Sequence, residues 1–345
     1  MKEFNRDDVE KFILGSQVFG AGGGGDPIEG KQFLLEAVER GVSIIDINEL
    51  AEDDILISGF KIGALIKGNE NWIDILAEST KELKESFGIT PKAIIAGELG
   101  PGNTSLAIAL ASKLGIPVVN EDLAEGRSVP ELPLNIFSII NKLPVPCVLS
   151  NGDNSVIVKK VKDIKELEMF ARSASVLGGI GFIGYSCKVK EVRKFLSVKS
   201  ISESIKLGNC IIDSLQQNQD VARNIVGISG GKELIRGEIT DVRHDEMKGF
   251  TAGHFIVDNG DDAVKVWFKN ENILAWKNDN IEITVPDIIA TIDLDGNRPL
   301  FNSELNIGKR VAILSIPSSR VWRSNEGLKL LNPRYFGFDL ECKLL

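Results

Sequence analysis

Residues 20–27 read Gly-Ala-Gly-Gly-Gly-Gly-Asp-Pro and form the first segment of the chain that could bind a small molecule. Successive backbone N–H groups in such a run can hold an oxyanion or a ring carbonyl. The structural alternative is a tight crossing at which any side chain would clash. The run of four glycines favours binding, and the candidate residues are Gly22, Gly23, Gly24, Gly25 and Asp26.

The glycine run does not have the context of a nucleotide-binding loop. Its spacing fits G-x-G-x-x-G, but a predicted helix over 7–19 precedes it, where a dinucleotide fingerprint needs a strand. The G-K-[ST] ending of a P-loop is also missing. Nucleotide binding is therefore the least favoured interpretation.

Two further loops place carboxylates and amides directly after predicted strands. Glu98 and Asn103 follow one short apolar strand, and Asp122 and Arg127 follow the next. A carboxylate there can act as a base, a metal ligand or an acceptor for ligand N–H groups. An arginine nearby would keep Asp122 ionised, which suits a ligand or acceptor role. The structural alternatives are a solvated charge, a helix N-cap for Asn103, or an Asp122–Arg127 pair that pins the loop.

These three loops are expected to form one site. In an open α/β sheet, ligands bind beyond the carboxyl ends of the strands. Residues 20–27, 97–103 and 120–131 should therefore converge on one cleft.

The second half of the chain adds a polar strand end and a histidine. Asn270, Glu271 and Asn272 could read the amide edges of a ligand, or could belong to a turn. His254 is most simply a strand histidine with an ordinary hydrogen-bond partner, and proton transfer is the alternative. Together with Asp122 and Glu98, His254 completes the set of candidate catalytic groups.

Composition limits the class of protein. The 345 residues, 43% hydrophobic and 26% charged, indicate a globular chain long enough for two domains. A formal net charge of −9 argues against nucleic-acid binding. We expect a cytoplasmic protein that does not enter a membrane, because the start of the chain is polar and the four cysteines are widely spaced. With two histidines, any metal would need carboxylate ligands.

The order of predicted elements indicates two domains of different class. Strands and helices alternate in the first part, which indicates an α/β domain with a largely parallel sheet covered by helices. One of these strands is predicted over 55–62, and a helix over 164–177 is predicted to have Asp163 as its N-cap. After Gly237 the hydrophobic residues alternate with period two, which is typical of half-buried antiparallel strands. We therefore expect an α/β domain over 1–168 and a mainly antiparallel β domain over 169–345.

Six collinear segments resemble the S-methyl thiohydantoin desulfurase-like family, formerly a domain of unknown function. They are residues 20–27, 97–132, 249–257, 268–276, 285–296 and 310–338. Their shared order over nearly the whole chain is more specific than any single motif. In many members we expect an Asp-x-Asp-like pair after the third strand. Here that position reads Asn120, Glu121 and Asp122, so a carboxylate at residue 120 is lost.

The resemblance implies a hydrolase that acts on hydantoin-like rings. Water would add to the ring carbon that bears sulfur, and hydrosulfide or methanethiol would leave. The protein would supply an activated water, donors for the developing charge and a proton for the sulfur. Arg127 and His254 could offset charge, Asn270 and Asn272 could read the ring amides, and the glycine run could hold an anionic tail. The resemblance also suggests a divalent metal such as zinc, although the sequence has no standard ligand spacing.

The same resemblance leaves a second function open. Genes of this family often lie beside hydantoinase/oxoprolinase-type genes, so the chain could be a non-catalytic ligand-binding or partner subunit of such a complex. A homo-oligomer is also expected, from the family and from the general prevalence of closed symmetric assemblies.

Overall fold

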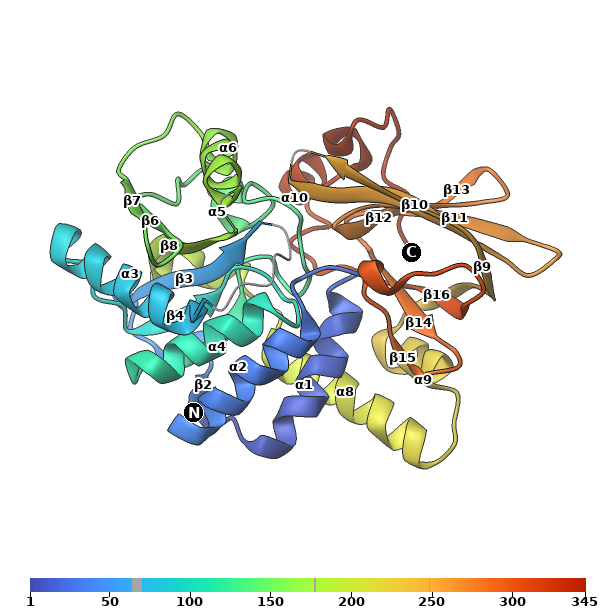
Figure 1. The fold of residues 1–345 in the computed structure, drawn as a ribbon, viewed down its shortest axis with the longest axis horizontal. Helices are drawn as coiled ribbons and strands as arrows, with labels where there is room; N and C mark the ends of the chain where they lie inside the picture. The colour runs from blue at the N-terminus through green and yellow to red at the C-terminus, as the bar shows by residue number, and fades with distance from the viewer. Residues whose placement is uncertain (64–69, 177, 248) are drawn as a thin grey trace. The chain divides into compact units, whose positions relative to one another are not determined.

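The computed structural model describes residues 1–63, 70–176, 178–247 and 249–345 (Figure 1). The chain divides into two compact units, neither of which is continuous in sequence. Unit 1 contains residues 1–9, 25–126 and 131–202, and unit 2 contains residues 10–24, 127–130 and 203–345. The chain therefore passes from one unit to the other inside the glycine run, between Gly24 and Gly25.

Unit 1 is built on an eight-stranded sheet with the order β1-β2-β5-β4-β3-β8-β6-β7. The neighbours β2, β5, β4 and β3 pair in parallel, and the remaining pairs are antiparallel. The strands are β1 Lys2–Glu3, β2 Ser43–Ile45, β3 Ile55–Ile62, β4 Ala93–Ala96, β5 Val118–Asp122, β6 Cys147–Ser150, β7 Ser155–Val158 and β8 Ile180–Lys188. The predicted α/β class is confirmed. The sheet is mixed because β1, β8 and β7 run antiparallel to their neighbours. For β6 and β7 the short connecting turn requires this direction.

The helices of unit 1 cover this sheet. Helix α4 packs against β3 and β4, α3 packs mainly against β6 and β8, and α6 contacts β8 and β3 (Figure 1). Nine consecutive residues of α4, Thr104 to Ser112, are buried, as expected for a helix made mainly of alanine, leucine and isoleucine. The elements are α2 Pro27–Arg40, η1 Ile47–Glu49, α3 Trp72–Phe87, α4 Asn103–Leu114, α5 Ile136–Ile139, α6 Ile164–Ser175, α7 Val189–Val192 and η2 Arg193–Phe195.

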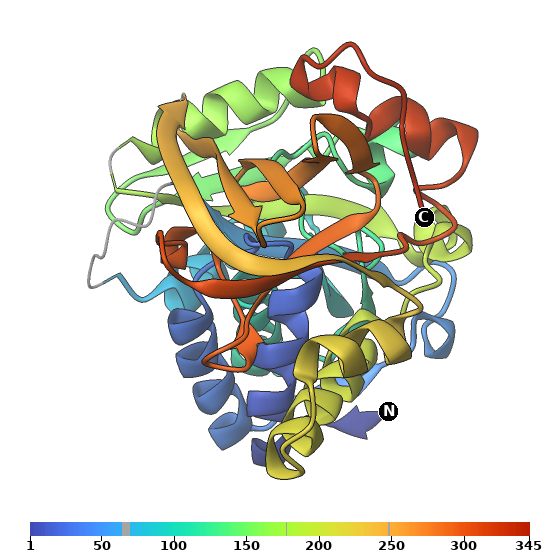
Figure 2. The same ribbon diagram turned by 90° about the vertical axis from the view of Figure 1, so that its right-hand side faces the viewer.

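Unit 2 is built on an eight-stranded sheet whose strands are all antiparallel, in the order β13-β12-β11-β10-β9-β16-β14-β15. The strands are β9 Lys232–Met247, β10 Phe250–Asp258, β11 Ala263–Lys269, β12 Glu271–Lys277, β13 Asn280–Thr284, β14 Ile288–Asp293, β15 Arg298–Pro299 and β16 Arg310–Ile316. The long strand β9 is strongly curved and pairs with both β10 and β16 (Figure 2). The predicted antiparallel β structure of the second half is confirmed.

Helices also contribute to unit 2. The division between the units falls inside α1 Arg6–Phe19 and α8 Ser200–Gln216. The other elements are α9 Val221–Ser229, η3 Asn302–Glu304, α10 Asn325–Leu330 and η4 Pro333–Phe336.

The two faces of β14 and β16 belong to different hydrophobic cores. Ile288, Ala290 and Ile292 of β14 pack in the cluster that includes Leu207 and Ile225 from α8 and α9. The intervening residues of both strands face the inside of the curved sheet, where Ile289, Val311 and Ile313 pack with residues of β10 and β11. The expectation that the alternating strands are half-buried is therefore wrong for β14, all of whose residues are buried, because helices cover its second face.

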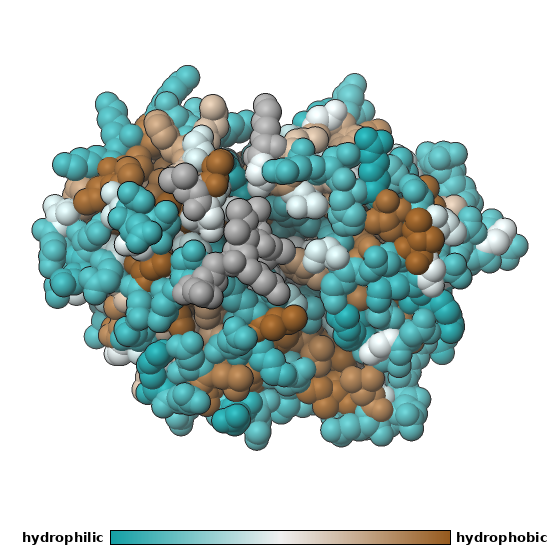
Figure 3. All heavy atoms as spheres, viewed as in Figure 1, coloured by the Kyte–Doolittle hydropathy of each residue, from teal (hydrophilic) through white to brown (hydrophobic). Residues whose placement is uncertain are grey.

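On the face seen in Figure 3, hydrophilic residues predominate and hydrophobic residues gather in small separate patches. Through residues 1–63, 70–176, 178–247 and 249–345, none of the helices combines the length and the apolar character needed to cross a bilayer.

Candidate functional site

The carboxyl ends of β3 and β4 carry a connected set of polar side chains in unit 1. Asn103, the first residue of α4, links the two strand ends. Its Oδ1 accepts the backbone N–H of Lys61 at 3.2 Å, and its Nδ2 donates to Glu98 Oε1 at 2.8 Å. Neighbouring parallel strands end at one edge of a sheet, so this cluster lies where ligands bind in α/β folds. Two predicted site residues, Glu98 and Asn103, are brought together here.

The helix-cap alternative for Asn103 is wrong. The N-cap of α4 is Gly102, which has no side chain to cap the helix, and Asn103 is already helical. The amide of Asn103 is engaged by β3 and by Glu98 instead. Its role is to hold a strand end and a carboxylate in fixed positions.

Lys61 brings a cation to the same edge. Its Nζ forms an ion pair with Glu29 of α2 and lies 5.4 Å from the centre of the Trp72 ring. Asp26 is the N-cap of α2 and accepts the N–H groups of Ile28 and Glu29 at 2.7 and 3.4 Å. Asp26 was predicted to bind substrate. Its observed contacts fix the first turn of α2, and so the position of Glu29.

Gly25 belongs to this edge as well, through a close backbone approach. At Gly25, where φ is +90°, an added Cβ would lie 2.9 Å from the Cα of Gly102. At Gly102, an added Cβ would lie 2.7 Å from the Cα of Gly25. The end of the glycine run and the 97–103 loop therefore touch, and both approaching residues need to be glycines.

Asp122 lies at the end of β5 and is fully buried. Its Oδ1 accepts the N–H of Ala124 at 2.7 Å, and its Oδ2 accepts the N–H of Gly126 at 2.8 Å and the Ser200 hydroxyl. Burial raises the pKa of Asp122 to about 7, and the charge of Glu125 adds to the rise, whereas the three donors lower the pKa.

The residues on either side of Asp122 also bind the segment of the chain that contains Ser200. Glu125 accepts the N–H groups of Ser197 and Val198, and Glu121 accepts Lys199 Nζ at 2.6 Å. Asn120 exchanges two hydrogen bonds with Ser202. The segment at 120–125 therefore binds the chain's own residues 197–202, which lead into α8.

The first part of the glycine run belongs to unit 2, where it lies against the start of β12. Glu271 Oε1 accepts the N–H of Gly24 at 3.2 Å and the Ser128 hydroxyl at 2.8 Å. A Cβ at Gly23 would lie 2.2 Å from the same Oε1. At Gly23, glycine is therefore required by the close approach of Glu271.

The other predicted polar residues of unit 2 also hold this loop. The backbone N–H of Asn272 donates to the Ala21 carbonyl at 2.8 Å, and that of Asn302 donates to the Gly22 carbonyl at 2.9 Å. The backbone of Asn270 is in the left-handed region, with φ 58°, and its carbonyl accepts a hydrogen bond from Asn302 Nδ2. Arg127 is buried and donates through Nη1 to the Pro286 carbonyl. Within unit 2, these residues join 20–24 and 127–128 to β12 and η3.

His254 lies elsewhere in the sheet of unit 2. It is on β10, opposite Arg243 and Trp267, and its Nε2 lies 2.9 Å from Asp241 Oδ2. This is the ordinary hydrogen-bonded strand histidine that the sequence indicated as the simpler reading. The convergence of all three loops on one cleft stays a prediction.

The residues described do not fit a bound metal ion. Across 1–63, 70–176, 178–247 and 249–345, no group of three or more His, Cys, Asp and Glu side chains comes close enough together to hold one. The carboxylates at the strand ends are instead paired with amide, hydroxyl or ammonium groups, as described above. No chemical step is therefore assigned to a metal.

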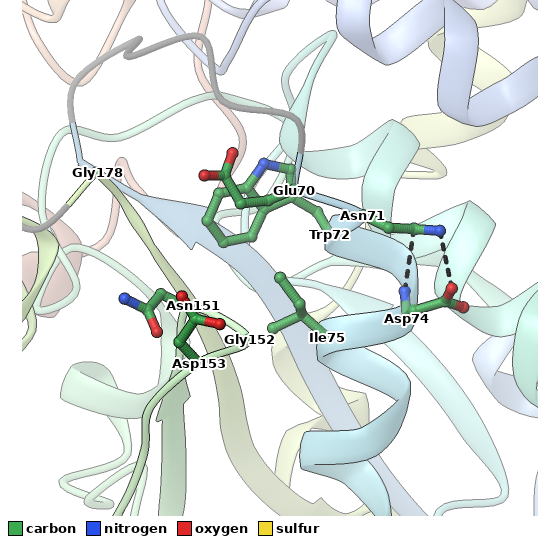
Figure 4. A pocket seen from close by; sticks show the side chains of 9 residues that line it. All are labelled: Glu70, Asn71, Trp72, Asp74, Ile75, Asn151, Gly152, Asp153 and Gly178. Atoms are coloured by element: carbon green, nitrogen blue, oxygen red, sulfur yellow. Dashed lines mark hydrogen bonds between the residues drawn. The ribbon is translucent and has the colours of Figure 1, made fainter.

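A pocket of about 350 Å³ opens at the same edge of the unit 1 sheet (Figure 4). Strands β3 and β6 both pair antiparallel with β8, so they run in the same direction and their carboxyl ends share an edge. The lining comes from the start of α3, the β6–β7 turn and the residues before β8. It consists of Glu70, Asn71, Trp72, Asp74, Ile75, Asn151, Gly152, Asp153 and Gly178.

Sequence reasoning missed Lys61, Glu29 and Trp72 in unit 1 and Ser128 and Asn302 in unit 2. Glu271 was considered only together with Asn270 and Asn272, as part of a polar strand end. Lys61 could have been found, because it is the penultimate residue of a strand that was predicted with its observed bounds, 55–62. No signal indicated that Glu271 and Asn302 contact the glycine run, because their partners there are more than 240 residues away in sequence.

Comparison with known proteins identifies relatives over the whole chain. A family model described as "S-Me-THD-like, N-terminal domain" matches residues 7–160, and one described as "S-Me-THD-like, C-terminal domain" matches residues 162–345. A crystal structure of a protein from Chromobacterium violaceum superposes with a TM-score of 0.82 at 21% identity, and the match covers 100% of both chains. At this identity the likeness shows the fold. No curated protein matches the chain significantly.

Proposed function

The chain belongs to the S-Me-THD-like family, and we propose that it hydrolyses the carbon–sulfur bond of an S-methyl thiohydantoin or opens a related cyclic amide. The observation that carries the proposal is that Asn103 binds both Glu98 and the backbone N–H of Lys61 at the carboxyl ends of β3 and β4. The ammonium group of Lys61 pairs with Glu29. The edge where α/β proteins bind ligands therefore carries a carboxylate, an amide that orients it and an ammonium group.

In this proposal Glu98 removes a proton from the attacking water. The water oxygen bonds to the ring carbon that carries sulfur, negative charge passes to a ring heteroatom, and the carbon–sulfur bond then breaks. The departing methanethiolate takes up a proton, so that water and substrate become a hydantoin and methanethiol. Lys61 stabilises the developing negative charge by electrostatic attraction, and Asn103 positions Glu98.

Asp122 is assigned a structural role in this proposal. Both of its oxygens accept hydrogen bonds from its own loop and from Ser200, and its side chain is fully buried. Such a carboxylate stabilises the connection between β5 and α8. His254, paired with Asp241, is likewise left outside the reacting group.

The test is turnover by the purified chain and by Glu98→Gln. Methanethiol released from S-methyl thiohydantoins is measured with a thiol-reactive dye. Loss of a positioned acid–base group lowers rates by about a hundredfold or more, so Glu98→Gln should fall by at least that factor. Glu39→Gln, which changes an exposed glutamate of α2, is the matched control and should retain activity.

An inactive wild-type chain would overturn the catalytic proposal. If that chain also co-purified with a hydantoinase-type subunit, a non-catalytic ligand-binding or partner role would take its place. We also propose a homo-oligomer, on family grounds and on the general prevalence of symmetric assemblies. Light scattering that found a monomer at micromolar concentration would contradict this.

A further inference from the structure

Among the lining residues that the structure describes, the pocket in unit 1 has three acidic side chains and no basic one. Of its three acidic residues, Asp74 is compensated by Lys113 at 2.6 Å and by Asn71 Nδ2 at 2.8 Å. The carboxylates of Glu70 and Asp153 have no ion pair or hydrogen bond with any residue that the structure describes. Within the described part of the chain, the pocket is therefore lined by two carboxylates that lack a compensating partner (Figure 4).

Trp72 supplies an aromatic wall to the pocket. Its side chain lines the pocket although the residue is only 4% exposed. Lys61 lies over the Trp72 ring but does not line the pocket, so its ammonium group is not a wall of the cavity.

The sign of the ligand charge follows from comparing two opposing fields. The N-terminus of α3 lies at the pocket and by itself attracts anions, with a strength of about half a positive charge. Asp74 in the first turn already opposes that partial charge. The full charges of Glu70 and Asp153 outweigh the remainder, and a tryptophan ring adds a preference for a cation that contacts its face. A cation is therefore favoured over an anion.

We infer that this pocket binds an organic cation, an ammonium or guanidinium group on a short alkyl chain. The inference rests on the proposed function in one respect: the cation is the basic side chain of an amino-acid-derived hydantoin-type ring. The volume of about 350 Å³ is of the size that holds such a group. Trp72 contacts Lys61 and also lines the pocket, so the pocket adjoins the proposed reacting groups.

The first test needs no ring and no turnover. Butylguanidinium and its neutral isostere butylurea are titrated into the full chain, and heat and tryptophan fluorescence are recorded. Because the two probes differ mainly in charge, butylguanidinium should bind about tenfold more tightly, and its affinity should fall as salt is added. Equal affinity of the two probes, or binding of inorganic phosphate at this pocket in their place, would overturn the inference.

Variants assign the binding to this pocket. The double variant Glu70→Gln with Asp153→Asn should remove the preference for butylguanidinium. Both residues are exposed, so folding should be unaffected. The control is Glu85→Gln, which changes an exposed glutamate near the other end of α3. This variant should keep the preference for butylguanidinium over butylurea. Trp72→Phe should abolish most of the fluorescence response, and retention of the response would place the binding elsewhere.

Turnover distinguishes failure of the inference from failure of the proposed function. Glu98→Gln should lose activity but keep its affinity for butylguanidinium. Cation binding by a chain without activity supports the pocket and refutes the hydrolase. If the chain is active, two S-methyl thiohydantoins are compared, one with a guanidinopropyl side chain and one with an alkyl chain of equal length. The kcat/KM for the guanidinopropyl substrate should be about tenfold higher. Activity without that preference refutes the pocket and leaves the hydrolase standing.

Discussion

Asn103 Nδ2 lies 2.8 Å from Glu98 Oε1, and the same side chain holds the N–H of Lys61 with its Oδ1 at 3.2 Å. One amide thus fixes both the carboxylate that follows β4 and the end of β3. The position needs a side chain that both donates and accepts a hydrogen bond. Asparagine donates to Glu98 and accepts from the Lys61 N–H, whereas aspartate would face Glu98 with a second negative charge.

The first prediction concerns the coupling between these two residues. In a double-mutant cycle of Asn103→Ala and Glu98→Ala, the coupling in the free energy of unfolding should be about 1 kcal/mol, as for a hydrogen bond to a charged group that is partly exposed. Urea denaturation measures it. Additive effects of the two changes would mean that the hydrogen bond does not persist in solution.

Asn103→Asp is the more informative single change. It keeps the acceptor for Lys61 but opposes Glu98, so it should destabilise the chain at neutral pH and recover when the pH is low enough to protonate the carboxylates. A loss that is independent of pH would contradict this account.

The second prediction follows from the buried carboxyl of Asp122, whose pKa is raised to about 7 by burial. The folded state then binds a proton that the unfolded state has already released, so stability falls as the pH rises from about 4 to about 7. Over this window the contribution amounts to about 3 to 4 kcal/mol. Asp122→Asn should remove that slope, as urea denaturation at several pH values can measure.

The control for Asp122 is Asp53→Asn. Asp53 is exposed, and Lys190 and Lys188 lower its pKa to about 2, so its change should leave the slope between pH 4 and 7 intact. An unchanged slope in Asp122→Asn would show that Asp122 is ionised in the folded state across this range.

The sequence was informative where a feature is local. The strand over 55–62 and the start of α6 after Asp163 were predicted as observed, because hydrophobic periodicity and side-chain capping depend on neighbouring residues. The antiparallel strands of unit 2 were recognised for the same reason. The nine-residue strand β8 was not predicted, because its glycines conceal a strand pattern that is stabilised by pairing with β3 and β6.

Contacts between distant segments could not be read in this way. Glu98 and Asn103 are five residues apart, and their proximity was expected from one loop. Glu271 contacts Gly24 across 247 positions, and nothing in either segment specifies the other. The residues at 120–125 were interpreted as facing a ligand, whereas Asp122 faces Ser200 of the same chain.

The third prediction tests the close approach of Glu271 to the glycine run. A methyl group at residue 23 would lie 2.2 Å from Glu271 Oε1, so Gly23→Ala should displace that carboxylate from Gly24 and Ser128. Overpacking of this kind costs about 1 to 3 kcal/mol. Thermal and urea unfolding measure the loss.

Gly227→Ala provides a control with the opposite sign. Gly227 lies in α9, and nothing within 4 Å would meet its Cβ. Alanine there should stabilise the chain by about 0.5 to 1 kcal/mol through helix propensity. Equal effects of the two substitutions would show that contact with Glu271 is not what requires a glycine at position 23.

The last prediction concerns Lys199, which holds two carboxylates of unit 1. Its Nζ lies 2.6 Å from Glu121 Oε1 and also pairs with Asp46. The Glu121 side chain is fully buried, and burial raises its pKa while Lys199 lowers it. Lys199→Met keeps much of the aliphatic stem but leaves Glu121 as a buried charge without its cation. Loss of one partner of a buried pair costs about 3 to 5 kcal/mol, and the partial exposure of Lys199 reduces this to about 2.

The pH dependence separates the charge from the packing. Removal of Lys199 raises the pKa of Glu121 further, so the loss in Lys199→Met is greatest at neutral pH. As the pH falls through the folded-state pKa of Glu121, the carboxyl becomes neutral and the loss should shrink. Urea denaturation at pH 7 and at about pH 4 measures both values. Lys206→Met, which removes an exposed lysine 3.3 Å from Glu203, should change stability by less than about 0.5 kcal/mol at either pH. A loss in Lys199→Met of the same size at both pH values would mean that the lysine stem, and not its charge, stabilises this corner of unit 1.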